Sequence, residues 1–353
     1  MFLALKEMKH AKLRYGLVIG IIFLIAYLVF FLTGLAYGLA QDNRTAVDKW
    51  QADAIILTKK ANDNLNMSRF PQSVAEEVKA AEQATLAQMP SVISKKNSEE
   101  TLNATFFGID SNAFLAPEIT EGRMFESGNE VVVDDSLAKQ YDIALGDVLT
   151  TTGNETENKV VGFTKNAKFN VAPVLYTSME NFEKSTADQQ MKTGQLVNAV
   201  VIRGQVDTLP DSLERLPIGK FIQALPGYQA QVLTFGFMIG FLIVIAAIVI
   251  GIFIYILTMQ KVEIFGVMKA QGIASGYIAK SVVAQTFLLA VLGTLIGLLA
   301  TIGTSLVLPE QVPFALNSLF LVAMSVLMVA FAMLGSFFSV RSVVKIDPLK
   351  AIG

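Results

Sequence analysis

Few side chains in this sequence are of types that carry out chemistry. Cysteine is absent and histidine occurs once, at His10, which excludes disulfides, iron–sulfur clusters, thiolate catalysis and sites of several histidines. The acidic pairs Glu76–Glu77 and Asp134–Asp135 could act as acid and base or bind Ca²⁺, but they lack the spaced oxygens and central glycine of a calcium loop. A solvated acidic surface is the favoured interpretation. We therefore expect no catalytic residue and no metal site.

The composition indicates a membrane protein. Of the 353 residues, 53% are apolar and only 16% are charged, against about 25% charged residues in an ordinary soluble domain. Four apolar stretches contain no Asp, Glu, Lys, Arg or His, and each is long enough to cross a hydrocarbon core of about 30 Å as a helix. These predicted membrane helices are residues 16–40, 232–259, 282–308 and 319–340.

The charged residues around these stretches indicate an orientation, because cytoplasmic segments of membrane proteins carry an excess of Lys and Arg. Basic residues gather at both ends of the chain and between the second and third stretches, at Lys6, Lys9, Lys12, Arg14, Lys261, Lys269, Lys280, Arg341, Lys345 and Lys350. Residues 41–231 are instead net acidic. We expect a multi-pass cell-membrane protein with both termini in the cytoplasm and residues 41–231 outside.

Residues 1–40 have a second interpretation, a cleaved signal peptide, because a basic start precedes the apolar run and small residues stand just before Gln41. The apolar region of a signal peptide has about 7–15 residues, whereas this run has about 25. A retained anchor is therefore the favoured interpretation.

Residues 41–231 have the composition of a globular domain, and we expect a mixed α/β fold. Short runs rich in β-branched and aromatic residues alternate with Gly, Asp and Asn turn signals. The predicted strands are 53–57, 102–109, 130–135, 147–152, 159–164, 171–177 and 198–204. Polar stretches at 73–89 and 178–185 are predicted to be helices. The single tryptophan, Trp50, is interpreted as an anchor or core residue rather than a ligand.

The order of one helix, a large outside domain and three further helices resembles the permease subunits of the MacB/FtsX superfamily of ABC transporters, the type VII arrangement. The resemblance covers nearly the whole chain. It is carried by ITEGRMFESGNEVVVDDSLAKQYDIALGDVLTTT at 119–152, KVEIFGVMKAQGIASGYIAKSVVAQ at 261–285 and IDPLKAIG at 346–353. It implies a four-helix membrane protein with an extracytoplasmic α/β domain between helices one and two.

The sequence has no GxxxxGK[ST] segment, so it does not bind ATP by the P-loop route. The resemblance implies a separate cytosolic P-loop ATPase and no enzyme activity in this subunit. The balance of 30 acidic and 28 basic residues indicates no nucleic-acid partner. Residues 260–281 combine an apolar ridge with charges, which favours a short amphipathic helix that docks the ATPase over a plain loop. The coupling candidates are Glu263, Phe265, Gly266 and Lys269. Residues 1–15 would form a second cytoplasmic amphipathic helix.

Within the superfamily, FLALKEMKHAKLRYGLVIGIIFLIAYLVFFLTGLAYGLA at 2–40 and PGYQAQVLTFGFMIG at 226–240 resemble the HrtB branch, the heme efflux permeases of Gram-positive bacteria. This implies a homodimer with an HrtA-like ATPase, heme as transported substrate, ATP used through the partner, and no permanently bound cofactor. The path would then need iron ligands other than Cys, and His10 lies on the cytoplasmic side. The candidates are Tyr228, Tyr37, Met238 and Glu214.

Each of these candidates also has a purely structural interpretation. Tyrosines gather in the aromatic belt at membrane interfaces, and methionines fill gaps between helices. Three pairs of glycines four residues apart would permit close helix approach, with the first two pairs beside a dimer seam. The pairs are Gly34/Gly38, Gly236/Gly240 and Gly293/Gly297.

The segments expected from the sequence are 1–15, 16–40, 41–231, 232–259, 260–281, 282–308, 319–340 and a cytoplasmic tail, 341–353. Two functions compete with heme export. The first is an FtsX-like regulator that relays ATPase strokes without cargo, for which an outside domain of about 190 residues is large. The second is a MacB-like exporter of peptides, antibiotics or lipoproteins, which would share the same architecture.

Overall fold

The structure is a computed structural model that describes residues 12–96, 98–126, 128–152, 156–186, 196–309 and 311–344, with the backbone alone for 337–344. The chain divides into two compact units, each described by itself. The helical unit comprises the chain up to Gly38 and from Leu233 onward, and the α/β unit is Leu39–Val232. Most of the helix expected at 1–15, His10, and the end of the tail expected at 341–353 lie outside the described residues.

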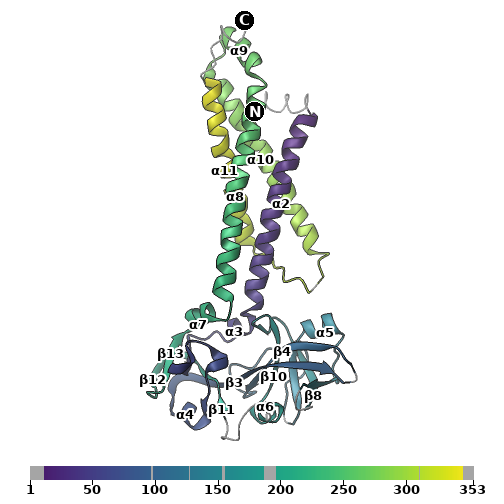
Figure 1. The fold of residues 1–353 in the computed structure, drawn as a ribbon, viewed down its shortest axis with the longest axis vertical. Helices are drawn as coiled ribbons and strands as arrows, with labels where there is room; N and C mark the ends of the chain where they lie inside the picture. Colours follow the sequence, from purple (N-terminus) through teal and green to yellow (C-terminus); the bar gives the residue numbers. More distant parts are fainter. Residues whose placement is uncertain are drawn as a thin grey trace. The chain divides into compact units, whose positions relative to one another are not determined.

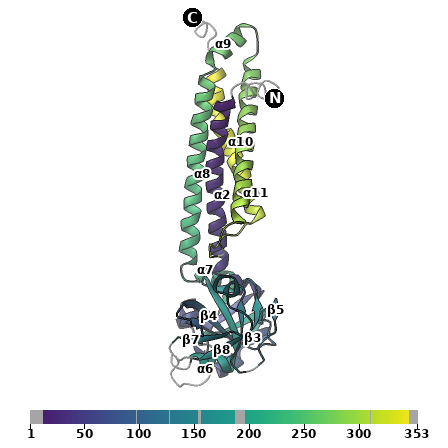
Figure 2. The ribbon, with the colours of Figure 1, turned by 90° about the vertical axis from the view of Figure 1, so that its right-hand side faces the viewer.

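The helical unit is built from long apolar helices that run alongside one another (Figures 1 and 2). They are α2 (Lys12–Asp42), α8 (Tyr228–Met259), α10 (Ser275–Ser305) and α11 (Ser318–Val344). Within the described ranges, these four are long and apolar enough to cross a membrane. Each helix begins before its apolar stretch, in polar flanking residues, and α10 ends at Ser305, short of the end expected at Leu308. A short helix, α9 (Val262–Ala270), connects α8 to α10.

Glycines allow α10 to pack closely on α2. A Cβ built on Gly293 would come within 2.5 Å of the Ile22 side chain. One built on Gly297 would come within 2.8 Å of Ala26. Near the end of the same contact, the hydroxyls of Tyr27 and Thr304 are hydrogen-bonded at 3.0 Å. The Gly293/Gly297 spacing therefore marks a close helix–helix contact.

The other two glycine pairs behave differently. Gly34 and Gly38 face Phe314 and Pro313 in the connection before α11, rather than another helix. The amide of Ala315 also donates to the Gly34 carbonyl, at 3.2 Å. At Gly236 and Gly240, no described atom lies within 4 Å of an added Cβ, so this face of α8 is open in the single chain.

The α/β unit contains a mixed sheet, two short strands that pair with each other, and short helices. The sheet strands are β1 (Ala54–Thr58), β3 (Lys79–Lys95), β4 (Thr101–Ile109), β5 (Glu121–Gly122), β6 (Glu130–Asp134), β7 (Val148–Thr151), β8 (Glu157–Thr164), β9 (Lys168–Phe169), β10 (Ala172–Ser178), β12 (Ala199–Thr208) and β13 (Leu213–Pro217). The separate pair is β2 (Phe70–Pro71) with β11 (Leu196–Val197). The helices are α3 (Thr45–Lys49), α4 (Gln72–Glu77), α5 (Ser136–Tyr141), α6 (Met179–Thr186) and α7 (Ile218–Ala224), with 3₁₀ turns at Lys59–Ala61 and Leu65–Met67.

The main sheet runs β13-β1-β12-β3-β4-β10-β6-β8-β5, with β7 pairing to β3 and β8, and β9 to β10. The β4–β10 and β6–β8 pairs are parallel and the other pairs are antiparallel. All seven strands expected from the sequence are present, and so is the helix expected at 178–185, as α6.

The helix predicted at 73–89 is wrong. Helix α4 ends at Glu77, and from Lys79 the chain forms the long strand β3. The residues here are Ala, Glu, Gln, Leu and Met, which favour helix locally. However, the first half of β3 is paired with β12 and its second half with β4, and Leu86 is fully buried. Non-local pairing and burial outweigh a propensity of a few tenths of a kcal/mol per residue.

Aromatic residues fill the core beneath α3 and α7. Trp50 is 1% exposed and packs against the rings of Phe107 and Phe221. Phe107 also meets Phe169 and Tyr176 edge to face. Such contacts add to the apolar area that each ring buries. The interpretation of Trp50 as a core residue is confirmed.

Candidate functional site

Tyr228 opens helix α8, where its amide donates to the Leu225 carbonyl at 3.0 Å. Its ring is half-buried and packs against the core cluster that contains Trp50 and Phe221. Beside it lies Arg44, whose Nε donates to the Asp48 carboxylate at 2.9 Å. The hydrogen bond that Arg44 donates to Asp48 is the main reason why the pKa of Arg44 is raised, against the effect of burial, and Tyr228 adds to the rise. Arg44 is thus a fixed cation next to the phenol of Tyr228.

This arrangement places a guanidinium and a phenolic oxygen side by side. Tyrosine bound through its oxygen is one of the protein ligands of heme iron. The pair Tyr228–Arg44 therefore combines an oxygen donor with a positive charge. Sequence reasoning singled out Tyr228 and missed Arg44, although Arg44 is four residues from Asp48, the spacing at which side chains meet on a helical turn.

The C-terminal end of α2 is held by the hairpin of β9 and β10. The amides of Asn170 and Val171 donate to the carbonyls of Asn43 and Asp42, each at 3.0 Å. Lys168 forms an ion pair with Asp42 at 2.7 Å. Since the last carbonyls of a helix have no partner within the helix, these amides act as its cap.

The same junction also reaches α8, because the Asn43 side-chain amide donates to the Gln231 carbonyl oxygen at 3.2 Å. The cap needs an unusual backbone: Asn170 has φ +49° and Val171 φ +69°. Positive φ is rare for a β-branched residue such as valine. The junction of α2, α8 and the hairpin therefore stores backbone strain in return for hydrogen bonds to the end of α2.

The four candidate ligands fall into the two units, two in each. Glu214 is half-buried on β13, opposite Leu57 of β1, whereas Tyr228 packs against the Trp50 cluster. Tyr37 of α2 meets the ring of Phe320 edge-on, at 5.6 Å between ring centres. Met238 of α8 is 37% exposed. Within the α/β unit, the polar neighbour that the structure gives Tyr228 is Arg44 rather than Glu214.

The coupling candidates on α9 face in two directions. Phe265 is 3% exposed and packs against Ile278 and Val282 of α10, and Gly266 is also buried. Glu263 is exposed and Lys269 partly exposed. The exposed apolar residues of α9 are Ile264 and Val267, which are 57% and 44% exposed. Sequence reasoning identified the helix but not which of its apolar residues point outward.

The acidic pairs are not catalytic in arrangement. Glu76 and Glu77 are exposed at the end of α4, as expected. The solvated surface predicted for the second pair is wrong for Asp134, which is 1% exposed. Its carboxylate accepts the amides of Ser136 and Ala167, at 3.0 and 2.6 Å. Asp134 is therefore a structural acceptor that joins the start of α5 to the loop before β9.

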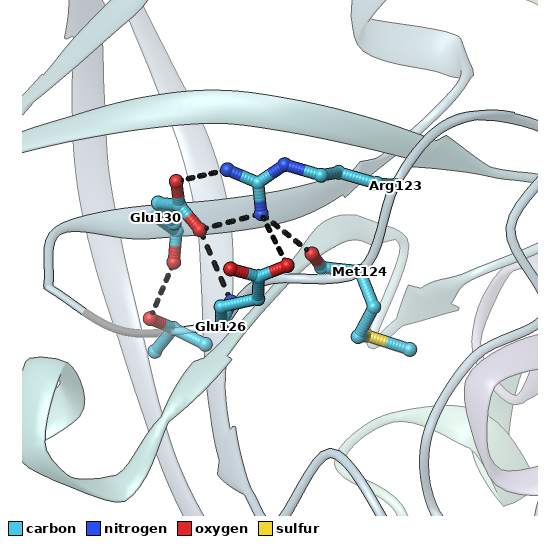
Figure 3. Close-up of polar contacts among 5 residues, drawn as sticks. Arg123, Met124, Glu126 and Glu130 are labelled. Carbon is cyan, nitrogen blue, oxygen red and sulfur yellow. Dashed lines mark hydrogen bonds and ion pairs between the residues drawn. The ribbon is translucent and has the colours of Figure 1, made fainter.

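Figure 3 shows a second carboxylate with a structural role. Glu130 accepts hydrogen bonds from the Arg123 guanidinium and from the Glu126 amide, the latter at 3.0 Å. The hydrogen bond from Arg123 is the main reason why the pKa of Glu130 is lowered. Arg123 also donates to the Met124 carbonyl. These contacts fix the turn before β6. In the part of the chain that the structure describes, no three His, Cys, Asp or Glu side chains gather to hold a metal ion.

Two family models match the chain. The MacB-like periplasmic core domain matches residues 15–214 and the FtsX-like permease C-terminal domain matches residues 236–348. The chain belongs to the MacB/FtsX family of ABC transporter permeases. It is accordingly a membrane protein with four membrane helices, and its α/β unit is the extracytoplasmic domain of the family.

Relatives in this family align over the full length of the chain. The putative hemin transport system permease proteins HrtB of Staphylococcus haemolyticus and Staphylococcus epidermidis are each 26% identical over 100% of this chain and 99% of their own length. An uncharacterized ABC transporter permease of Mycobacterium tuberculosis is 24% identical over the same shares. Among solved structures, the extracellular domain of the ABC-type transporter YknZ is 12% identical and covers 47% of this chain and 99% of its own, with a TM-score of 0.31.

Proposed function

We propose that this MacB/FtsX-family permease is the membrane subunit of a dimeric ATP-driven exporter that expels heme from the membrane of a Gram-positive bacterium. The observation that carries the proposal is the full-length similarity to relatives named hemin transport permeases. The position of Tyr228 beside Arg44 supports it, since tyrosine oxygen is a heme-iron ligand.

In this proposal Tyr228 coordinates the iron of the cargo through its oxygen, and Arg44, held by Asp48, offsets the negative charge of that oxygen. Tyr37, Met238 and Glu214 remain the candidates for further ligands along the path. Because heme is the cargo, the affinity of the site must be low enough for heme to be released.

ATP hydrolysis is assigned to a separate HrtA-like P-loop ATPase, because the chain has no P-loop segment of its own. The excess of basic residues at both ends and in 260–281 supports a cytoplasmic location of these segments, with residues 41–231 outside. A second copy of the chain would use the open α8 face at Gly236 and Gly240.

The exposed face of α9 is proposed as the contact for the ATPase, with Glu263 and Lys269 at its charged edges. Ile264 and Val267 supply exposed apolar area in the middle of that face. Phe265 and Gly266 then act from the other side, by seating α9 on α10. A push on α9 would in this way reach the membrane helices.

The test is hemin binding by the purified chain with its ATPase. A Soret band should appear on addition of hemin and should shift or weaken in Tyr228→Phe. Tyr255→Phe is the matched control, because Tyr255 lies on the same helix and is 44% exposed. A Soret band with the same position and intensity in Tyr228→Phe as in the wild type would remove Tyr228 as a ligand.

Absence of any hemin binding would remove heme as the cargo. A MacB-like exporter of peptides, antibiotics or lipoproteins would then show another cargo that stimulates ATP hydrolysis. An FtsX-like regulator would show ATP-dependent changes of the extracytoplasmic domain without any cargo.

A further inference from the structure

Lys261, at the corner between α8 and α9, buries its side chain inside the helical unit. Lys261 is 9% exposed. Its Nζ donates to the hydroxyl of Tyr15 on α2 at 2.6 Å and lies 3.5 Å from Oε1 of Gln285 on α10. Nζ also lies 5.3 Å from the centre of the Tyr15 ring, within range of a cation–π contact. One side chain therefore contacts two membrane helices.

The surroundings of this ammonium are mainly apolar. The pocket that holds the Lys261 side chain is lined by Ile254, Leu257 and Leu289, and Thr258 and Thr286 supply its hydroxyl groups. Both hydroxyls donate to backbone carbonyls of their own helices. Placing a cation among such residues costs free energy, and a well-packed apolar side chain of similar volume would avoid that cost. A buried charge with specific hydrogen-bond partners can instead fix one arrangement of the elements that supply those partners.

The contacts of α9 show which arrangement Lys261 fixes. Phe265 seats α9 on α10 through Ile278 and Val282, and such an apolar contact is non-directional. The Lys261–Tyr15 hydrogen bond adds α2 to this corner, and it is directional. We propose that Lys261 is a positioning residue that ties α9 to both α2 and α10, so that a push on α9 moves the two helices together. The proposal rests on the proposed function, in that α9 receives the push from the ATPase.

The first arm of the test needs no ATPase. Because the chain has no cysteine, spin labels can be attached at Leu17→Cys on α2 and Ile264→Cys on α9, both of which replace exposed residues. Pulsed EPR should give a narrow distance distribution in the full chain. Lys261→Met should broaden it, Lys261→Arg should keep it narrow, and Lys280→Met, on an exposed lysine of α10, should leave it unchanged.

Tyr15→Phe provides a variant that keeps the buried ring and removes only the acceptor oxygen. It should broaden the distribution as Lys261→Met does, and the double variant should broaden it no further, as expected for two residues that act through one bond. A distribution that stays narrow in both single variants would overturn the proposal.

The second arm uses the complex with its ATPase. In Lys261→Met, cargo moved per ATP hydrolysed should fall about tenfold while ATP hydrolysis continues, the size expected for loss of coupling between two sites. In Lys261→Arg, the cargo moved per ATP hydrolysed should stay at the wild-type level. A wild-type complex that moves no cargo would refute the proposed function, and the EPR result would still decide the role of Lys261. Equal transport per ATP in Lys261→Met and wild type would overturn the inference itself.

Discussion

Gly251 of α8 and Gly335 of α11 meet backbone to backbone. A Cβ placed on Gly335 would come within 2.8 Å of the Gly251 Cα atom. Close approach of this kind is how membrane helices gain packing energy, since lipid tails offer no hydrophobic drive for association. The two glycines are in different helices and belong to none of the spaced pairs in the sequence, so only the structure shows that they define the crossing of α8 and α11.

Gly335→Ala should therefore destabilise the helical unit. The added methyl meets backbone, which cannot rotate away, and overpacking of this kind costs about 1–3 kcal/mol. The measurement is the unfolding midpoint of the detergent-solubilised chain. Gly303→Ala is the control, because no described atom lies within 4 Å of a Cβ at Gly303. Equal midpoints for the two variants would contradict the crossing.

Val171→Gly should stabilise the extracytoplasmic domain. Val171 has φ +69°, and removing a β-branched side chain from that conformation should relieve about 1 kcal/mol of strain after the entropy cost of glycine. Val171→Ala separates the two causes, since alanine removes the branch but keeps a Cβ at positive φ. Denaturant unfolding of the full chain checks this. A loss of stability in Val171→Gly would show that the side chain, 41% exposed, contributes more than the strain costs.

Glu130→Gln should weaken the domain at neutral pH and not in acid. The hydrogen bond from Arg123 lowers the pKa of Glu130 in the folded state, so its contribution to stability is present above the unfolded carboxyl pKa of about 4.3 and is lost as pH falls below it. The effect is small because the Arg123 side of the ion pair is 49% exposed. Unfolding midpoints of variant and wild type between pH 7 and pH 3 should converge. A constant difference would exclude ionisation of Glu130 as the cause.

Ile264→Asp and Val267→Asp should abolish association with the ATPase without unfolding the chain, because both residues are exposed on α9. Phe265→Ala should instead lower the unfolding midpoint, since a buried Phe→Ala substitution costs about 3–5 kcal/mol. Co-purification with the ATPase and thermal unfolding separate the two effects. Wild-type association in both Asp variants would exclude this face of α9 as the contact.

Much of the architecture follows from composition and periodicity. The membrane helices were predictable because an uncharged run of that length has no other stable place, and the seven expected strands because β-branched runs stood between clear turn signals. The error at 73–89 arose where helix-forming residues sit in a strand that pairs with β12 along its first half and with β4 along its second. No local pattern reports such pairing, because it depends on residues far away in the chain.

The candidate site was less predictable than the fold. Tyr228 and α9 could be selected from their positions next to a membrane helix. The residues that contact them, however, come from distant parts of the sequence. Arg44 reaches Tyr228 from the other end of the α/β unit's sequence, and Lys261 reaches Tyr15 across the helical unit. Contacts between segments this far apart depend on packing geometry, which the residue types alone leave undetermined.

The length of β3 sets how the extracytoplasmic domain comes apart. From Lys79 to Lys95 a single strand pairs first with β12, then with β4, and at its end with β7. Loss of the pairing with β12 or with β4 leaves half of β3 without inter-strand hydrogen bonds. The amides of both halves of β3 should therefore exchange with deuterium together, through one all-or-none opening rather than as separate local events.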